Sequence, residues 1–482
     1  MSTEFESVSP IDGEVVWSGK ATPPEEVQQR MTRSHIAWQK WKRTPLDSRI
    51  TIVRRYGEEV ASARQEIADL ITREVGKLSW DSAGEVAASI AKVEVSIKAL
   101  QERRSTSVLE DVSSQSVTVS RRVRYQPLGV TLVLGPFNFP LHLPGGQIIP
   151  ALLAGNSVVF KPSEQATAVG EWMVDAWDRA GLPQDVLQMI PGEAATATAA
   201  IDAPELAAVF LTGGQRAGEA IHRRLAGRPA VLLALELGGN NPVVLMNDTD
   251  PAVAARLVSF SAFISAGQRC TCARRALFVV GDKTEQQIEA LVQRTQSLRV
   301  AMPGADPVGQ VGPLVSSSAA ETLRQTYEKL IELGCRPLIP FRSHRENPGL
   351  VYPSILDATD LDGQAISEIG CHEWFGPMLV IARVPDFESA LESAADTRYG
   401  LSAALLGGNV DGFEQFVERV GAGVVNWNGP TTGAAGNLPF GGLGDSGNHR
   451  PAGYFAIDFC NDPVASIEQP VPADTDPWGI AK

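Results

Sequence analysis

Histidine and cysteine are scarce in this chain of 482 residues, which has six histidines and five cysteines. The cysteines form neither a CxxC pair nor a paired framework, and this favours a reduced, cytoplasmic setting over a disulfide-rich secreted one. The histidines form no cluster with one another or with cysteine, so a dedicated metal site is not expected.

Long apolar runs and excess positive charge are also missing. The longest apolar-rich stretch, 145–160, is interrupted by Pro150, Gly155 and Asn156 and is too short for a membrane span. The N-terminus lacks the basic and apolar regions of a signal peptide. With 42 basic and 56 acidic side chains, the net charge is −14. We therefore expect a soluble protein with neither nucleic acid nor membrane as a partner.

The length and composition are those of a globular protein with more than one domain. The chain is 44% hydrophobic and too long for a single core. From Pro23 to Arg104 the apolar spacing predicts helices, one of them ending at Gly76. Residues from Ser116 to Tyr125 alternate between apolar and polar side chains, which predicts a strand. This strand is either an ordinary edge strand or one arm of a hairpin that pairs elsewhere.

Short β-rich runs alternate with helical ones from Gly129 onward, and this predicts a parallel α/β sheet. The same alternation recurs beyond Glu236 and predicts a second α/β domain. The expected strands are 157–160, 206–211, 243–246 and 276–280, and the expected helices are 170–180, 251–265 and 283–298.

Three polar side chains are candidates for catalytic roles. Cys270 follows a Gly-Gln turn beside Arg269, and a nearby cation favours the nucleophilic thiolate. Glu236 ends an apolar strand before two glycines, where burial would raise its pKa toward that of a general base. Asn138 lies between two phenylalanines and has an amide able to bind an oxyanion. Taken singly, each also fits a structural role: a buried thiol, a capping carboxylate and a turn asparagine.

Two further segments suit a dinucleotide. Lys161 and Glu164 follow a strand, at the edge where α/β sheets bind ligands, and suit ribose hydroxyls. The turn from Gly213 to Gly218 follows a strand and opens a helix, so that its backbone N–H groups can face a pyrophosphate. This turn is neither GxGxxG nor a P-loop, and alone it is a weak signal.

In this order and spacing, the segments resemble the aldehyde dehydrogenase superfamily along essentially the whole chain. The motifs that carry the resemblance are GPFNFP, KPSE, the TGG turn, LELGG, GQRC, HEWFGP, RYGLSAAL and LPFGGLGDSG.

The resemblance implies a mechanism and a set of site residues. Cys270 would attack an aldehyde carbon to give a thiohemiacetal, with the oxyanion held by Asn138 and the backbone N–H of Cys270. Hydride transfer to NAD would leave a thioester, and Glu236 would activate the water that hydrolyses it. The residues expected to bind NAD are Lys161, Ser163, Glu164, Gly192, Gly213, Gly214, Gln215, Arg216, Ala217, Gly218, Leu237, Glu373 and Phe375.

Cofactor preference follows from three of these positions. Glu164 near the ribose 2′-hydroxyl would disfavour a 2′-phosphate, so NAD is expected over NADP. Arg216 and Ala217 depart from the acidic and β-branched residues of many relatives, and an arginine there could tolerate a phosphate.

The implied fold is an aldehyde dehydrogenase-like α/β fold in three parts. These are a Rossmann-like NAD-binding domain from 1–112 and 127–238, an α/β catalytic domain from 239–444, and a β oligomerisation arm from 113–126 and 453–482. Such an arm implies a homodimer or homotetramer.

Within the family, several segments resemble N-succinylglutamate 5-semialdehyde dehydrogenases of arginine catabolism. They are Asn240-Asn241, GQRCTCARR, VNWNGPTTGA and SGNHRP. The implied substrate carries carboxylates, for which Arg269 and Arg450 are candidate ligands, although surface or intersubunit pairing suits them equally. The alternatives are an NAD(P)-dependent dehydrogenase of another carboxylated semialdehyde, a CoA-acylating enzyme, and a catalytically silent relative. Retention of Glu236 argues against CoA acylation, and the joint presence of Cys270, Glu236 and Asn138 argues against a silent relative.

Overall fold

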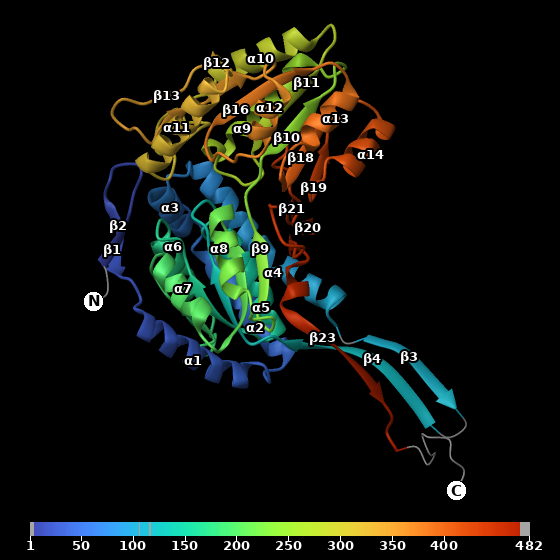
Figure 1. Cartoon of the computed structure of the whole chain (residues 1–482). Coiled ribbons are helices and arrows are strands. Elements are labelled where there is room, and N and C mark those ends of the chain that lie inside the picture. The colour runs from blue at the N-terminus through green and yellow to red at the C-terminus, as the bar shows by residue number, and fades with distance from the viewer. Residues whose placement is uncertain (1–3, 106, 115–116, 473–482) are drawn as a thin grey trace.

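The chain folds around two large sheets, and a narrow three-stranded sheet projects from the body (Figure 1). The computed structural model describes residues 4–105, 107–114 and 117–472. Within this part of the chain, no helix is both long enough and apolar enough to cross a membrane.

A layer of helices covers the N-terminal part of the body, as predicted for Pro23–Arg104. It consists of α1 (Pro24–Trp41), α2 (Leu46–Ser62), α3 (Arg64–Val75) and α4 (Ser79–Arg103). Gly76 ends α3 with a left-handed φ of 74°, which glycine adopts without strain. Sequence reasoning did not predict the hairpin of β1 (Glu4–Val8) and β2 (Val15–Lys20) that precedes this layer.

The first large sheet is parallel and has the order β7-β6-β5-β8-β9. Its strands are β5 (Val130–Leu134), β6 (Ser157–Lys161), β7 (Leu187–Met189), β8 (Leu206–Thr212) and β9 (Leu232–Glu236), connected through α5 (His142–Ala154), α6 (Thr167–Arg179), α7 (Ala194–Asp202) and α8 (Gln215–Leu225). Every residue of β5 and β6 is buried, as expected when helices cover both faces. The strand order reverses at β5, and ligands bind at the carboxyl ends of strands beside such a reversal.

The second large sheet confirms the second α/β unit. Its order is β12-β15-β16-β11-β10-β18-β19, and only the β12–β15 pairing is antiparallel. The strands are β10 (Asn241–Leu245), β11 (Ala273–Val279), β12 (Arg336–Ile339), β15 (Ser354–Asp357), β16 (Met378–Val384), β18 (Ser402–Leu406) and β19 (Val424–Trp427). The helices are α9 (Pro251–Phe263), α10 (Thr284–Gln296), α11 (Ser317–Glu332), α12 (Gly363–Gly370), α13 (Phe387–Ala395) and α14 (Val410–Arg419).

Short elements complete the body. They are the strand pairs β13 (Arg342–Ser343) with β14 (Val351–Tyr352), β17 (Tyr399–Gly400) with β21 (Leu443–Gly444) and β20 (Pro439–Phe440) with β22 (Ala452–Gly453), and the 3-10 helices η1 (Ile264–Gly267) and η2 (Ala456–Phe459).

The projecting sheet joins two distant parts of the sequence. Strand β4 (Val117–Pro127) pairs antiparallel with β3 (Ser107–Ser114) and with β23 (Asn461–Glu468). The strand expected at Ser116–Tyr125 is therefore confirmed, except for Ser116, which lies outside the described residues. The last ten residues assigned to the arm, 473–482, also lie outside them. The limits of the three domains and the joining of subunits by the arm stay predictions.

Candidate active site

Cys270 lies in a tight turn between α9 and β11, in the unit built on the second sheet. Gly267 has a φ of 70°, and a Cβ there would stand 2.1 Å from the carbonyl oxygen of Gly376. Only glycine fits this close approach. The fully buried Arg274 donates from Nη2 to the carbonyl oxygens of Gly267 (2.9 Å) and Arg269 (3.2 Å). Hydrogen bonds from a buried arginine thus fix the backbone of the turn before Cys270.

Cys270 is half-buried, and acidic groups lie near its thiol. Burial raises its pKa well above the ordinary value, and the charges of Glu236 and Glu373 raise it further. Arg269 opposes them with a smaller lowering effect. The cysteine is therefore a neutral thiol at physiological pH, and attack on a carbonyl requires that its proton leave.

Glu236 ends β9, the last strand of the first sheet, where the chain crosses toward the second sheet (Figure 1). The residue is 5% exposed, and its Oε1 has no hydrogen-bond partner. Burial raises the pKa of its carboxyl to about 7, although Lys92 and the Thr212 hydroxyl act in the opposite direction. A carboxyl with this pKa both accepts and releases protons near neutral pH.

Asn138 follows β5 and reaches the cysteine turn. It is 8% exposed, and its Nδ2 donates a 2.9 Å hydrogen bond to the carbonyl oxygen of Gln268. The structure therefore brings three predicted residues together: Asn138 bonds to the turn that carries Cys270, and Glu236 acts electrostatically on the Cys270 thiol.

The glycine turn predicted to face a pyrophosphate leads into α8. Gly214 precedes the helix, no side chain caps this end, and a Cβ on Gly214 would meet no atom within 4 Å. Gly218 packs against Leu237, since a Cβ there would lie 2.8 Å from the leucine side chain. Gly213 donates from its backbone N–H to the carbonyl oxygen of Glu236 (3.0 Å). This helix end is open and close to Glu236 in the fold, so it fits an anionic group.

The other predicted members of this turn differ in exposure. Gln215 is fixed, because its Oε1 accepts from the Tyr399 hydroxyl (2.8 Å) and its Nε2 donates to Glu219 (2.9 Å). Arg216 and Ala217 are exposed on the first turn of α8. A contact of Arg216 with a cofactor therefore stays a prediction.

Lys161, Ser163, Glu164 and Gly192 lie together at the carboxyl end of β6. The buried Lys161 ammonium donates to the carbonyl oxygen of Gly192 (2.6 Å) and lies 3.6 Å from the Glu164 carboxylate. Burial lowers the pKa of this lysine. Ser163 is 9% exposed, whereas the Glu164 side chain is 49% exposed and able to meet a ligand.

Glu373 and Phe375 lie on the side of the site formed by the second unit. The backbone N–H of Gly239 donates to Glu373 Oε1 (3.1 Å), and the ring of Phe375 packs edge-on against Phe137 with centroids 6.0 Å apart. Burial raises the pKa of the Glu373 carboxyl, and Arg274 opposes this effect. Both predicted residues thus lie near the segments that carry Glu236 and Asn138.

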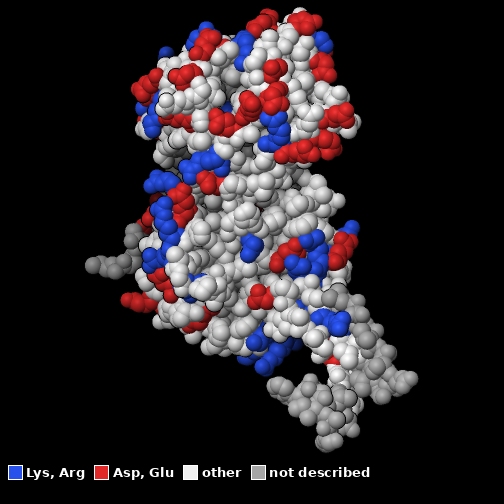
Figure 2. All heavy atoms as spheres, turned by 45° about the vertical axis from the view of Figure 1, so that its right-hand side comes forward, with Lys and Arg blue, Asp and Glu red and all other residues white. Residues whose placement is uncertain are grey.

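Arg269 and Arg450, the candidate carboxylate ligands, differ in their surroundings. Arg269 is already paired with Asp81 (2.8 Å) and donates to Ser265, so its charge is neutralised. Arg450 is exposed and makes a 3.4 Å hydrogen bond to the carbonyl oxygen of His449. Acidic side chains are frequent over the unit built on the second sheet (Figure 2). The ion pair of Arg269 favours the structural alternative for that residue.

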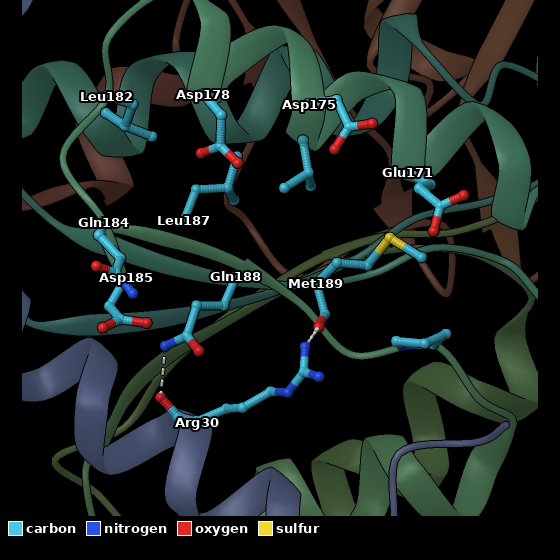
Figure 3. Close-up of a pocket in the computed structure, with 12 residues that line it drawn as sticks. Arg30, Glu171, Asp175, Asp178, Leu182, Gln184, Asp185, Leu187, Gln188 and Met189 are labelled. Atoms are coloured by element: carbon cyan, nitrogen blue, oxygen red, sulfur yellow. Dashed lines mark hydrogen bonds between the residues drawn. The ribbon is translucent and has the colours of Figure 1, made fainter.

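One surface groove lies away from these residues. It has a volume of about 700 Å³ between α1, α6 and β7, and in Figure 3 the Arg30 guanidinium donates to the carbonyl oxygen of Met189 while Asp175 and Asp178 extend from α6. None of the predicted site residues lines it. This groove is therefore separate from the predicted site.

Sequence reasoning missed three residues that interact with Glu236, either directly or through a neighbour. Gln147 of α5 donates to the Thr212 hydroxyl (3.1 Å), which in turn interacts with Glu236, and Lys92 of α4 acts on Glu236 through its charge. A signal for Lys92 was present: it falls between Ser89, Val93 and Ser96 on the buried face of α4, where an ionised lysine requires a partner.

Comparison with known proteins agrees with this geometry. The profile described as "Aldehyde dehydrogenase family" matches residues 1–463. A glyceraldehyde-3-phosphate dehydrogenase from Methanocaldococcus jannaschii, complexed with NADP, is 26% identical with a TM-score of 0.87, over 97% of this chain and 99% of the other. The NADP-dependent counterpart from Bacillus halodurans, also complexed with NADP, is 26% identical with a TM-score of 0.88, over 97% and 96%.

A more distant structure shows the same fold. An indole-3-acetaldehyde dehydrogenase variant from P. syringae, in complex with NAD⁺, is 24% identical with a TM-score of 0.89, over 97% of this chain and 93% of the other. Because the family profile spans nearly the whole sequence and the fold is shared, this chain belongs to the aldehyde dehydrogenase family.

Proposed function

We propose that this protein oxidises an aldehyde to a carboxylic acid through a covalent intermediate on Cys270. The observation that carries the proposal is the convergence of Asn138 and Glu236 on the turn that holds this cysteine. The Cys270 thiol gives its proton to water, and the sulfur attacks the aldehyde carbon, forming a C–S bond and an oxyanion. The Asn138 amide and the Cys270 backbone N–H donate to that oxyanion and stabilise it.

Glu236 completes the reaction after oxidation has produced a thioester. Its carboxylate takes a proton from water, the resulting hydroxide attacks the thioester carbon, and the C–S bond breaks to return the cysteine and release the acid. Burial of this carboxyl suits the task, because a pKa of about 7 makes it a stronger base than an ordinary glutamate.

NAD is the proposed cofactor. When bound, it supplies the hydride acceptor for oxidation of the thiohemiacetal carbon. The open end of α8 at Gly214 fits a pyrophosphate, and Lys161 and the exposed Glu164 fit the adenosine ribose. Because the relatives of 26% identity are complexed with NADP, the kcat/KM values with NAD and NADP must be compared directly. An NADP value equal to or above the NAD value would overturn the preference.

The proposed substrate is N-succinyl-L-glutamate 5-semialdehyde. Support comes from the subfamily segments, including GQRCTCARR around Cys270 and Asn240-Asn241 at the start of β10. A panel of aldehydes ranked by kcat/KM tests the assignment, with succinic semialdehyde, glutamate semialdehyde and simple aliphatic aldehydes beside the succinylated compound. A best substrate without a carboxylate would overturn the substrate assignment but leave the reaction type intact.

The fate of the thioester is tested by analysing the product in the presence of CoA. Free acid as the product supports hydrolysis by water, whereas an acyl-CoA product contradicts it.

The projecting sheet is proposed to join subunits in a homodimer or homotetramer. Ile467 on β23 is 76% exposed, the highest value among the exposed large apolar side chains of the described residues. Ile467→Asp should shift the protein toward smaller species in light scattering, whereas Val410→Asp on α14, also exposed, should not. A monomeric wild-type protein would contradict the proposed assembly.

A further inference from the structure

Lys92 is a buried cation that the chemistry described above does not use. It lies on α4, is 7% exposed, and donates a 2.6 Å hydrogen bond from Nζ to the carbonyl oxygen of Gly453 on β22. Among the described residues it forms no direct ion pair. A buried ammonium with only a neutral partner is costly, and such a group persists when its charge is needed nearby.

The neighbouring helix makes room for this lysine. A Cβ on Gly146 of α5 would lie 3.6 Å from Lys92 Cε, so the lysine side chain passes directly over the glycine. The ammonium at the end of the side chain donates to the carbonyl oxygen of Gly453. Helix α4, helix α5 and strand β22 therefore set the position of this positive charge together.

Glu236 is the acidic group that interacts with this charge. Burial lowers the pKa of Lys92 to about 8, and Glu236 opposes that effect; Lys92 in turn opposes the raising of the Glu236 pKa by burial. Glu236 Oε1 is buried without a hydrogen-bond partner, so the nearby ammonium is a main source of stabilisation for its ionised form.

Three of the other titratable groups around the pair are neutral at physiological pH, and a fourth is paired with an acid. Burial lowers the pKa of His142 on α5 to about 4, and Lys92 and Lys77 lower it as well. Burial raises the pKa of the thiols of Cys270, beside Glu236, and of Cys460 at the end of η2, beside Lys92. Lys77 is itself paired with the buried Glu85. Apart from the Lys77–Glu85 pair, Lys92 and Glu236 are therefore the charged groups among those named, and each acts on the pKa of the other.

We propose that Lys92 is a positioning residue for Glu236: its ammonium, anchored on the Gly453 carbonyl, is the buried counter-charge that keeps the Glu236 carboxylate ionised near neutral pH. This inference rests on the proposed function, because it concerns the base that activates water. The thioester has no thiol proton to lose, so the pH dependence of its hydrolysis reports on Glu236 rather than on Cys270.

The test is the pH profile of kcat for Lys92→Met, which removes the charge and keeps a long side chain. The midpoint of the rising limb should move upward by about one pH unit, and turnover near pH 7 should fall roughly fivefold. Activity should recover at higher pH. Lys92→Arg keeps the charge and should keep the wild-type midpoint. Lys98→Met on the same helix, where the lysine side chain is 66% exposed, is the matched control and should change nothing.

Several results would overturn the inference. One is an equal loss of turnover at every pH with no movement of the midpoint, which indicates a merely structural role. Another is a rise in KM confined to carboxylated aldehydes, which assigns Lys92 to substrate binding. If the Met variant does not fold, as judged by thermal melting, Lys92→Gln is measured instead with the same expectations.

A separate measurement distinguishes this inference from the proposed function. The amplitude of the pre-steady-state burst of reduced cofactor reports formation of the thioester. A burst in the wild type together with slow turnover in Glu236→Gln supports the proposed function. If the midpoint of the pH profile of kcat is then unmoved in Lys92→Met, only the role of Lys92 is rejected. Absence of both the burst and the Glu236→Gln effect rejects the proposed function itself.

Discussion

The side chain of Asn241 holds the backbone of the cysteine turn: its Nδ2 donates to the carbonyl oxygens of Cys270 (2.7 Å) and Cys272 (2.8 Å). Its Oδ1 accepts from the backbone N–H of Ser402 (2.9 Å) at the start of β18. The residue is 1% exposed, so these bonds are made without competition from water. The first residue of β10 therefore links the nucleophile to the centre of the second sheet.

Asn241→Asp removes both donors and keeps the acceptor, so it should displace Cys270 with little change in volume. Two buried carbonyl oxygens lose a partner, at about 1–3 kcal/mol each, and the melting temperature should fall. We expect kcat to fall by roughly 100-fold, because small displacements of a nucleophile have large effects. Kinetics and thermal melting of the purified variant check both effects. Wild-type kcat in a destabilised variant would show that the bonds serve stability only.

Turnover should depend on pH through Glu236. Burial raises the pKa of this carboxyl to about 7, so the fraction of ionised base falls as the pH drops through that value. One pH unit below it, about a tenth of the molecules carry the carboxylate, and hydrolysis of the thioester should slow in proportion. The pH profile of kcat measures this limb. A rate that stays constant down to the pKa of an ordinary glutamate would contradict the role of Glu236.

Gly238→Ala should weaken cofactor binding through Glu373. A Cβ on Gly238 would lie 1.9 Å from Glu373 Oε2, so the carboxylate must move away. We expect the KM for NAD to rise about tenfold, which corresponds to about 1.4 kcal/mol. Gly84→Ala, at a position on α4 where a Cβ meets nothing within 4 Å, is the matched control and should leave the KM unchanged. An unchanged KM in Gly238→Ala would remove Glu373 from the cofactor site.

Glu164→Gln should relax the preference for NAD. The Glu164 side chain is 49% exposed beside Lys161, and its negative charge would repel a 2′-phosphate. Without that charge, kcat/KM with NADP should rise several-fold while the value with NAD changes little. Measuring the ratio of the two values in wild type and variant provides the check. A ratio that does not move would place the source of discrimination elsewhere, with the exposed Arg216 as the next residue to replace.

Much of the fold could be predicted because its strands are short, apolar and bounded by glycine or proline. The run SVVF became β6, and the αL glycine Gly76 ends α3 as its position suggested. The antiparallel pairing of β12 with β15 could not be predicted, since direction depends on the connection between strands rather than on their residues. The hairpin of β1 and β2 was missed because its strands are short and partly polar.

The site was predictable only where a motif marked it. Cys270, Glu236 and Asn138 lie in distinctive segments, and the sequence order could not by itself bring those segments together. Lys92 was missed because its role depends on two contacts that are distant in sequence, with Gly146 and with Gly453. Conversely, the position of Arg269 beside Cys270 suggested that this arginine binds a carboxylate of the substrate. Only the structure revealed its ion pair with Asp81.

Mass spectrometry of Glu236→Gln incubated with NAD and the aldehyde examines whether Cys270 carries an acyl group that Glu236 releases. We predict a stable adduct on the peptide that contains Cys270, heavier by the aldehyde less the two hydrogen atoms lost in oxidation, and none in Cys270→Ala. An adduct on a different cysteine, or the absence of any adduct while Glu236→Gln turns over at the wild-type rate, would contradict the account.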